Sequence, residues 1–198
     1  MSVLKSIRNL FIEPEVFFEN YTKNRLGIPF LITVVYAAVA AVCAYISSMQ
    51  TAAQAFADIP GVSMEDVMPA LAGTAAASAF FLALLAWLGM SLLFVIALKI
   101  FCRPAPKVKE IMHITAYGAI PLCIATVVEM LISFTGSAPS WATLILSAAV
   151  LFLTIPIWVK GFEKFGAGPE KRVLTAVLAA CIVPALITLF PIITALVL

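Results

Sequence analysis

The sequence has little charge and few of the side chains that most enzymes need. Charged residues make up 11% of the 198 residues, whereas a typical soluble domain contains about 25%. The only histidine is His113, and the chain contains no Gly-x-Ser-x-Gly, His-Glu-x-x-His or phosphate-loop motif. We therefore expect a non-enzymatic protein with no catalytic residues, no cofactor and no metal ion.

The Glu110-x-x-His113 pattern and the four cysteines are the features of the sequence that could bind a metal ion. Glu110 and His113 have the spacing of a di-iron ligand pair, but such a site needs a second copy and two further carboxylates. The simpler interpretation is a surface pair. The cysteines form no Cys-x-x-Cys motif, so neither a zinc site nor a disulfide framework is expected.

Apolar residues are abundant instead. They make up 64% of the chain, and the mean hydropathy is +1.13. A soluble fold of this size could not bury so much apolar surface, so lipid must be the solvent for most of it. The sequence therefore predicts an all-α polytopic membrane protein, a five-transmembrane-helix bundle formed by one membrane domain, residues 27–198. The predicted spans are residues 28–49, 72–101, 114–135, 141–159 and 174–197.

Residues 1–26 precede the first span and are amphipathic. Apolar residues recur at helical spacing from Leu4 to Phe11 with basic residues between them, and a second apolar stripe follows Pro14. We predict short amphipathic helices in the cytoplasmic headgroup region, with their apolar side toward the lipid. The alternative is a solvated tail. A cleaved signal peptide is not expected, because the first long apolar run starts only after residue 26 and exceeds the 7–15 residues of a signal core.

The basic residues are distributed very unevenly. All 12 lie before the first span, around the connection between the second and third spans, or between the fourth and fifth spans. By the positive-inside rule, the N-terminus lies in the cytoplasm and the C-terminus outside. So strong an asymmetry also argues against a dual-topology protein. The 12 residues are Lys5, Arg8, Lys23, Arg25, Lys99, Arg103, Lys107, Lys109, Lys160, Lys164, Lys171 and Arg172.

The last eight of these basic residues are candidates for contacts with anionic lipid headgroups or with a partner protein. Nucleic-acid binding is not expected, because the basic loops lie against a membrane and offer no aromatic platform for bases.

Small residues and prolines indicate how the spans pack. Small residues mark helix contacts in lipid, and they are frequent in the second span, at 72–77, and in the fifth, at 176–180. We expect these two spans to pack together; the alternative is that alanine is simply well tolerated in helices. Pro121 in the third span and Pro184 and Pro191 in the fifth remove backbone donors, which predicts kinks in both.

Glu129 is the one acidic residue inside a predicted span. It lies six residues from the outer end of the third span, or ~9 Å by helical rise. A carboxylate in hydrocarbon is costly and usually faces the bundle interior. Glu129 is either a neutral, hydrogen-bonding strut or part of a path for a proton or cation. Its candidate neighbours at the same depth, forming an intramembrane polar cluster, are Tyr45, Ser78, Ser147 and Thr188.

Three short motifs carry a resemblance to a known family. The basic loop leads into Ile114-Thr-Ala-Tyr117-Gly118-Ala-Ile-Pro121 at the start of the third of five spans. Pro14-x-x-Phe17-Phe18 occurs near the N-terminus, and Trp158-x-x-Gly161-Phe162 leads from the fourth span into the next loop. With these motifs the chain resembles the Yip family of Ypt/Rab-GTPase-interacting membrane proteins, in particular its prokaryotic branch.

The resemblance implies a five-span bundle with a cytoplasmic N-terminus, self-association or pairing with related membrane proteins, and, in eukaryotes, roles in membrane trafficking. The family-motif residues are Pro14, Tyr117, Gly118 and Pro121. Eukaryotic members carry a longer cytosolic N-terminal region, whereas about 26 residues precede the first span here, which puts GTPase binding in doubt. The plasma membrane of a prokaryote is the expected location.

Two hypotheses for the function follow. In the first, the protein is non-enzymatic and organises the membrane, or binds proteins or lipids, through its cytoplasmic basic face. In the second, it is a small transporter or channel that moves a proton or cation by way of Glu129.

Overall fold

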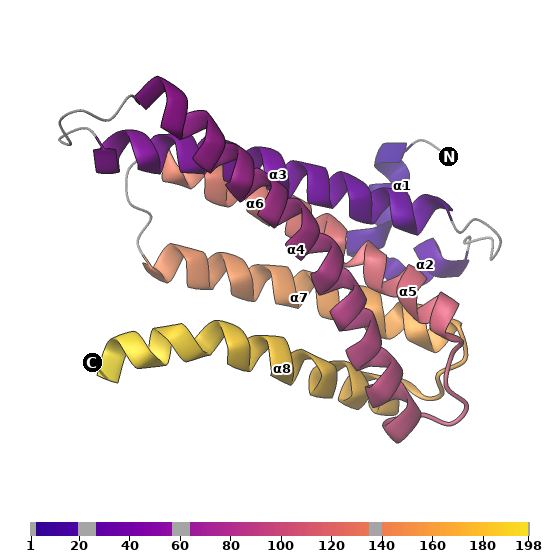
Figure 1. Cartoon of the computed structure of the whole chain (residues 1–198). Helices are drawn as coiled ribbons and strands as arrows, with labels where there is room; N and C mark the ends of the chain where they lie inside the picture. The colour runs from indigo at the N-terminus through magenta and orange to yellow at the C-terminus, as the bar shows by residue number, and fades with distance from the viewer. Residues whose placement is uncertain (1–2, 20–26, 57–63, 135–139, 198) are drawn as a thin grey trace.

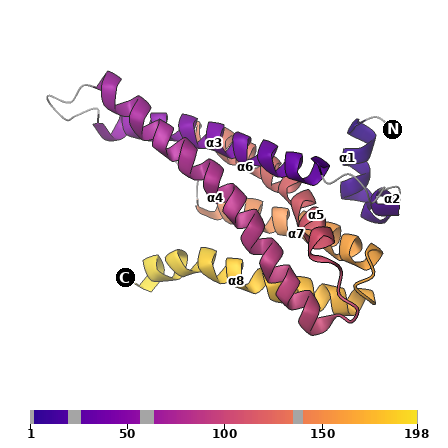
Figure 2. The same ribbon diagram turned by 45° about the vertical axis from the view of Figure 1, so that its right-hand side comes forward.

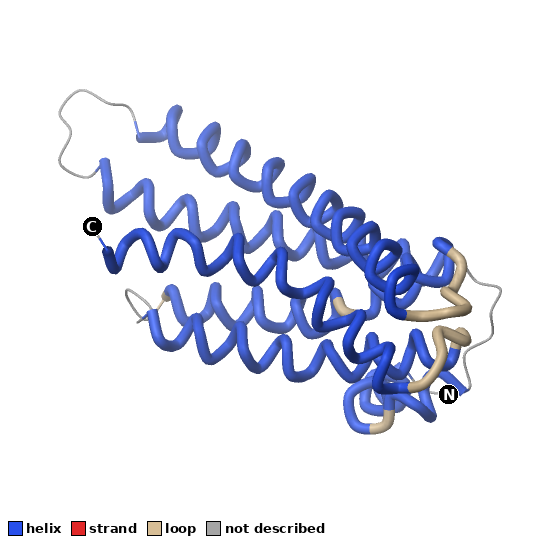
Figure 3. Tube along the Cα trace, turned by 90° about the horizontal axis from the view of Figure 1, so that it is seen from below, coloured by secondary structure: helices blue, strands red, loops and turns tan. Residues whose placement is uncertain are grey.

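The computed structural model of the chain describes residues 3–19, 27–56, 64–134 and 140–197. Throughout these ranges the regular structure is helical and includes no strand (Figure 3). The all-helical prediction is confirmed to this extent. The helices are α1 (Val3–Ile12), α2 (Pro14–Glu19), α3 (Gly27–Phe56), α4 (Met64–Phe101), α5 (Val108–Tyr117), α6 (Ala119–Ser133), α7 (Ser140–Lys164) and α8 (Glu170–Val197).

Four segments of the described residues are long and apolar enough to cross a membrane. They correspond to the first four predicted spans. α8 has 28 residues, but its role as a fifth span remains a prediction. The four segments are Gly27–Ala52 in α3, Val67–Phe101 in α4, Val108–Ser133 in α5 and α6, and Ile145–Lys164 in α7.

The helices form a bundle in which α4 runs obliquely. α3 packs along both α4 and α6, while α7 packs against α8. α4 crosses the other helices at an angle and meets α8 near its own C-terminal end (Figure 1). The candidate span of α4 has 35 residues, which corresponds to about 52 Å of helix against a hydrocarbon core of ~30 Å. An oblique course is the simplest way for a helix of this length to fit a bilayer.

The expected packing of the second and fifth apolar segments is found, but with different residues on α4. Phe94 and Leu98 of α4 lie in one buried core with Ala176 and Val177 of α8, and all four are fully buried. In the predicted small-residue stretch 72–77, Gly73 and Ala77 are exposed, although Ala72 is buried.

The third span is interrupted where a kink was predicted. α5 ends at Tyr117 and α6 begins at Ala119, so the break falls at Gly118, three residues before Pro121. The Gly118 N–H donates to the Thr115 carbonyl at 3.1 Å. By contrast, α8 continues as one helix through both of its prolines, and a kink there remains a prediction.

α5 begins six residues earlier than the predicted third span because a polar cap sets its start. The Lys107 backbone N–H donates to the Glu110 carboxylate at 2.9 Å, and the Lys107 carbonyl accepts from the Ile111 N–H at 3.0 Å. A side chain that satisfies an otherwise unpaired backbone donor stabilises a helix start. Glu110 therefore serves as a helix cap, and α5 carries Lys109 and His113 on its first turns.

The basic segments gather at one end of the bundle. This basic end consists of α1 and α2, the connection between α4 and α5, and the connection between α7 and α8 (Figure 1). The C-terminal end of α8 lies at the opposite end. Lys23 and Arg25 fall outside the described residues.

Candidate functional site

The three family-like motifs come together near the basic end. Residues of α2, of the α5–α6 break and of the C-terminal part of α7 pack against one another, and we call this cluster the motif core. Two buried groups of side chains contribute to it, and α7 supplies residues to both. The members of the motif core are Phe17, Phe18, Ile114, Tyr117, Gly118, Trp158, Gly161 and Phe162.

Gly118 makes room for the indole of Trp158. A Cβ added at residue 118 would lie 2.6 Å from Trp158 Cζ2 and 2.6 Å from its Nε1, closer than real carbon contacts allow. The φ of Gly118 is −65°, which any residue can adopt. The requirement for glycine is therefore one of space, set by a side chain 40 positions further along the chain.

Gly161 makes a second close contact in the reverse direction. A Cβ at residue 161 of α7 would lie 2.7 Å from Ile114 Cγ2 on α5 and 3.0 Å from Phe18 Cζ on α2. Thus Trp158 of α7 packs against Gly118, between α5 and α6. In return, side chains of α5 and α2 pack against Gly161 of α7. Missing side chains at two points permit three helices to approach closely, as in other membrane helix contacts.

Aromatic rings complete the motif core. The Tyr117 ring lies 5.2 Å from Phe17 and 5.8 Å from Phe18 between centroids, in both cases edge to face. Phe94 of α4 lies 4.8 Å from Trp158 between ring centroids and also contacts Phe162. Edge-to-face pairs at these distances are favourable, so the core ties α2, α4, α5 and α7 together.

The N-terminal helices dock on the bundle through part of their apolar surface. Leu10 of α1 and Phe18 of α2 are each only 1% exposed, in a group with Tyr117 and Ile157. Ile12, by contrast, is 67% exposed. One apolar side is thus covered by protein, and part of the remaining apolar surface stays open.

Most of the candidate basic residues are exposed at the basic end. Lys160 differs, because its Nζ lies 3.1 Å from Glu163 and 3.3 Å from Glu170. This cation joins the end of α7 to the start of α8 and is already neutralised by two carboxylates. The exposed ones are Lys99, Arg103, Lys107, Lys109, Lys164, Lys171 and Arg172.

Cys102 lies beneath this charged surface. It is 1% exposed. Burial raises the pKa of the Cys102 thiol, and the positive charge of Arg172 offsets part of that effect. Cys102 is therefore an internal thiol and a poor handle for capturing partners.

Glu129 lies on α6 with an exposed side chain. In the described part of the chain, no hydrogen bond joins it to Tyr45, Ser78 or Ser147, which are exposed on α3, α4 and α7. The side chain of Thr188 lies outside the described residues. Whether these residues form a cluster therefore stays a prediction.

Two residues that the sequence analysis did not select lie beside Glu129. Tyr36 of α3 is within hydrogen-bonding reach of Thr126 and is close enough to Glu129 for an electrostatic interaction. Thr126 precedes Glu129 by one turn of α6, so helical spacing alone could have indicated it. Tyr36 could not be found in this way, because depth counting assumes upright helices in a known register.

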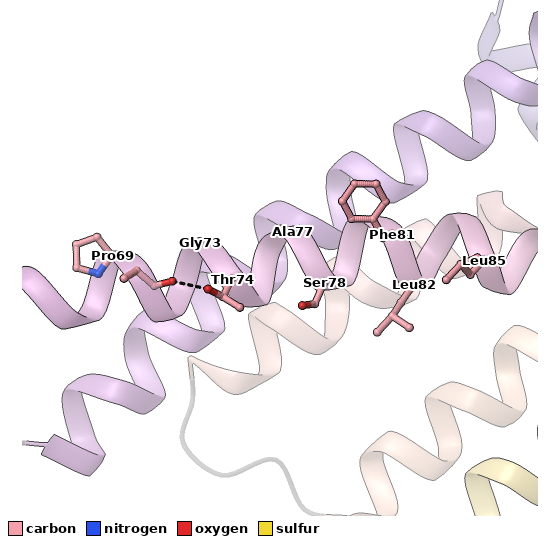
Figure 4. Close-up of a pocket in the computed structure, with 9 residues that line it drawn as sticks. Pro69, Gly73, Thr74, Ala77, Ser78, Phe81, Leu82 and Leu85 are labelled. Carbon is pink, nitrogen blue, oxygen red and sulfur yellow. Dashed lines mark hydrogen bonds between the residues drawn. The ribbon is translucent and has the colours of Figure 1, made fainter.

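Ser78 lines a hollow on α4 rather than a site between helices. Every residue of the lining belongs to α4, and Thr74 within it donates its hydroxyl to the Ala70 carbonyl at 2.9 Å (Figure 4). A ligand in this hollow would therefore contact a single helix, which is a poor basis for a binding site. The lining residues are Pro69, Ala70, Gly73, Thr74, Ala77, Ser78, Phe81, Leu82 and Leu85.

Comparison with known proteins identifies the family. A family model described as the Yip1 domain matches residues 8–193, which includes most of the N-terminal helices as well as the bundle. No curated protein and no solved structure matches the chain. The matched region covers nearly the whole chain and contains all four candidate spans. This chain is therefore an integral, multi-pass membrane protein that belongs to the Yip1-domain family.

Proposed function

We propose that this protein is non-enzymatic and organises the membrane, or binds partner molecules, through its basic end. The observation that carries the proposal is the arrangement of charge. Seven of the eight candidate cations are exposed and gather at one end of the bundle, and exposed cations beside lipid attract anionic headgroups. The family-like motifs pack into a closed core directly below them, which supports a structural role for the motifs.

The proposed topology places the basic end in the cytoplasm. The distribution of Lys and Arg along the sequence supports an N-terminus inside. With α8 as a fifth span, the C-terminus lies outside; its 28 residues are long enough for a crossing. α1 and α2 then lie at the headgroup level, with Ile12 toward lipid and Leu10 toward the bundle.

The proposed partners are anionic lipids, and a second copy of the chain or a related membrane protein. The motifs favour the prokaryotic branch of the family, and hence a prokaryotic plasma membrane as the location.

Spin-labelled lipids test the lipid part of this proposal. The full chain is reconstituted in phosphatidylcholine vesicles that contain a trace of spin-labelled phosphatidylglycerol or of spin-labelled phosphatidylcholine. We expect the anionic lipid to show the larger motionally restricted fraction, and the difference to shrink as salt rises. Equal fractions for the two lipids would contradict lipid binding by the basic end.

A second candidate function is the movement of a proton or cation by way of Glu129. The observation that favours it is that Tyr36 of α3 is close enough to Thr126 and to Glu129 of α6 to interact with both. Proton and cation flux into vesicles containing the wild type or the Glu129→Gln variant tests it. A flux that is unchanged by the substitution, or is absent from both proteins, removes this candidate.

A further inference from the structure

Four cations from distant parts of the sequence meet where α4 ends and α8 begins. Lys99 and Arg103 belong to the end of α4 and the loop after it, whereas Lys171 and Arg172 lie in the first turn of α8. The two ends lie side by side in both views (Figures 1 and 2). We call this group of four cations the α4/α8 corner.

Buried packing holds the two halves of the α4/α8 corner together. Leu98 and Cys102 on the α4 side and Val173 and Val177 on α8 are at most 1% exposed and belong to one core. Arg172 is close enough to Cys102 to act on its thiol electrostatically. The corner therefore rests on a rigid contact.

Three carboxylates of the neighbouring helices are already engaged by other groups. Glu163 and Glu170 both bind Lys160, and Glu110 caps α5. Within the ranges that the structure describes, none of the four corner cations forms an ion pair. Among the described residues, this cluster of positive charge therefore has no carboxylate bound to it.

Exposed apolar side chains lie next to the corner on the same two helices. Ile100 is 66% exposed and Phe101 40% on α4, and Leu174 is 39% exposed on α8. These side chains need lipid chains around them, since they lie at the ends of apolar helices. A phospholipid can pair its phosphate charge with the cations and pack its acyl chains against the exposed apolar side chains. A soluble anion can do only the first.

We propose that the α4/α8 corner is a discrete binding site for an anionic phospholipid whose headgroup carries two phosphates. Four cations on two elements exceed what one singly charged headgroup neutralises, and basic pockets between spans are known to recognise such headgroups. Arginine adds directed, charge-assisted hydrogen bonds to phosphate oxygens. The inference rests on the proposed lipid-binding function and adds to it a location and a lipid class.

Native mass spectrometry of the full chain in detergent tests the site. The protein is titrated with tetraoleoyl cardiolipin, which has two phosphates, and with dioleoyl phosphatidylglycerol, which has one. We expect one cardiolipin to bind more tightly than phosphatidylglycerol. The Lys99→Gln, Arg172→Gln double variant, with one change on each helix, should lose about tenfold or more of the cardiolipin affinity.

The matched control removes the same charge elsewhere at the basic end. Lys109→Gln with Lys164→Gln changes two exposed cations on α5 and α7 and should lower cardiolipin affinity clearly less than the corner variant does, because only a general attraction to anionic headgroups is lost. A charge-conserving variant, Lys99→Arg with Arg172→Lys, should keep most of the affinity, and it separates loss of charge from damage to the fold.

Each remaining outcome overturns a defined part of the inference. Equal losses in the two Gln double variants would mean that charge acts diffusely, which removes the discrete site but leaves the proposed function standing. Equal affinity for the two lipids would remove the preference for two phosphates. Binding of neither lipid by the wild type would remove both the site and the lipid part of the proposed function.

Discussion

Trp158 occupies the space in which a side chain at residue 118 would have to lie. Its ring atoms come within 2.6 Å of the position that a Cβ of Gly118 would take. Trp158 itself is 6% exposed and is held from the other side by Phe94 of α4. Two motifs that are far apart in the sequence are thus two halves of one contact.

Replacement of Gly118 by alanine should destabilise the protein. The new methyl group overpacks a buried contact between helices, which typically costs about 1–3 kcal/mol. The change can be measured as a lower midpoint of unfolding of the purified full chain in detergent. Gly89→Ala is the matched control, because nothing lies within 4 Å of a Cβ there; it should be neutral or slightly stabilising in a helix. Equal destabilisation by both substitutions would contradict a specific contact.

The cost of Gly118→Ala should be smaller when Trp158 is phenylalanine. The closest ring atoms are Cζ2, Nε1 and Cε2 of the indole, and phenylalanine lacks this bicyclic group. A double-mutant cycle should therefore show a favourable coupling of about 1 kcal/mol or more. Gly161→Ala serves as the comparison, because its methyl group would meet Ile114 and Phe18 instead. A similar coupling of Trp158→Phe with Gly161→Ala would argue against the pairing described.

The sequence predicts single elements here better than the contacts between them. Four apolar runs were located correctly, because hydropathy is a local property. The helix of the third run begins at Val108, before the predicted span, because a polar cap at Glu110 sets the helix start and hydropathy does not register a cap. The motifs around Tyr117 and Trp158 were recognised separately, but only the fold shows that they touch.

The candidate sites show the same limit. A count of positive charges along the chain treats Lys160 like the others, whereas its engagement by Glu170 depends on how α7 turns into α8. The neighbours of Glu129 were chosen by depth along upright helices. With a break at Gly118 and an oblique α4, depth along the sequence no longer decides which side chains are close.

Replacement of Phe18 by alanine should loosen the N-terminal helices. Phe18 is 1% exposed and contacts both the Tyr117 ring and the Gly161 region. Loss of a buried phenylalanine side chain costs about 3–5 kcal/mol in a packed core. Hydrogen exchange of residues 3–19 should become faster, with little change in α7. Ile12→Ala, at a position that is 67% exposed, is the control and should leave exchange unchanged; a large effect there would mean that α1 docks by its other side.

The Cys102 thiol should react slowly and at unusually high pH. Only the thiolate attacks a maleimide or iodoacetamide, and burial raises the pKa of Cys102, so the thiolate fraction at a given pH is smaller than for a free cysteine. In a variant whose other three cysteines are alanine, the labelling rate should still be rising with pH above the ordinary midpoint of about 8.5.

Arg172 lowers the pKa of Cys102, so Arg172→Gln should move the profile to still higher pH and slow labelling at pH 8. Lys171→Gln removes the same charge from the adjacent position and should shift the profile less. A profile with the ordinary midpoint and the rate of a free thiol would show that the end of α4 is not covered by α8.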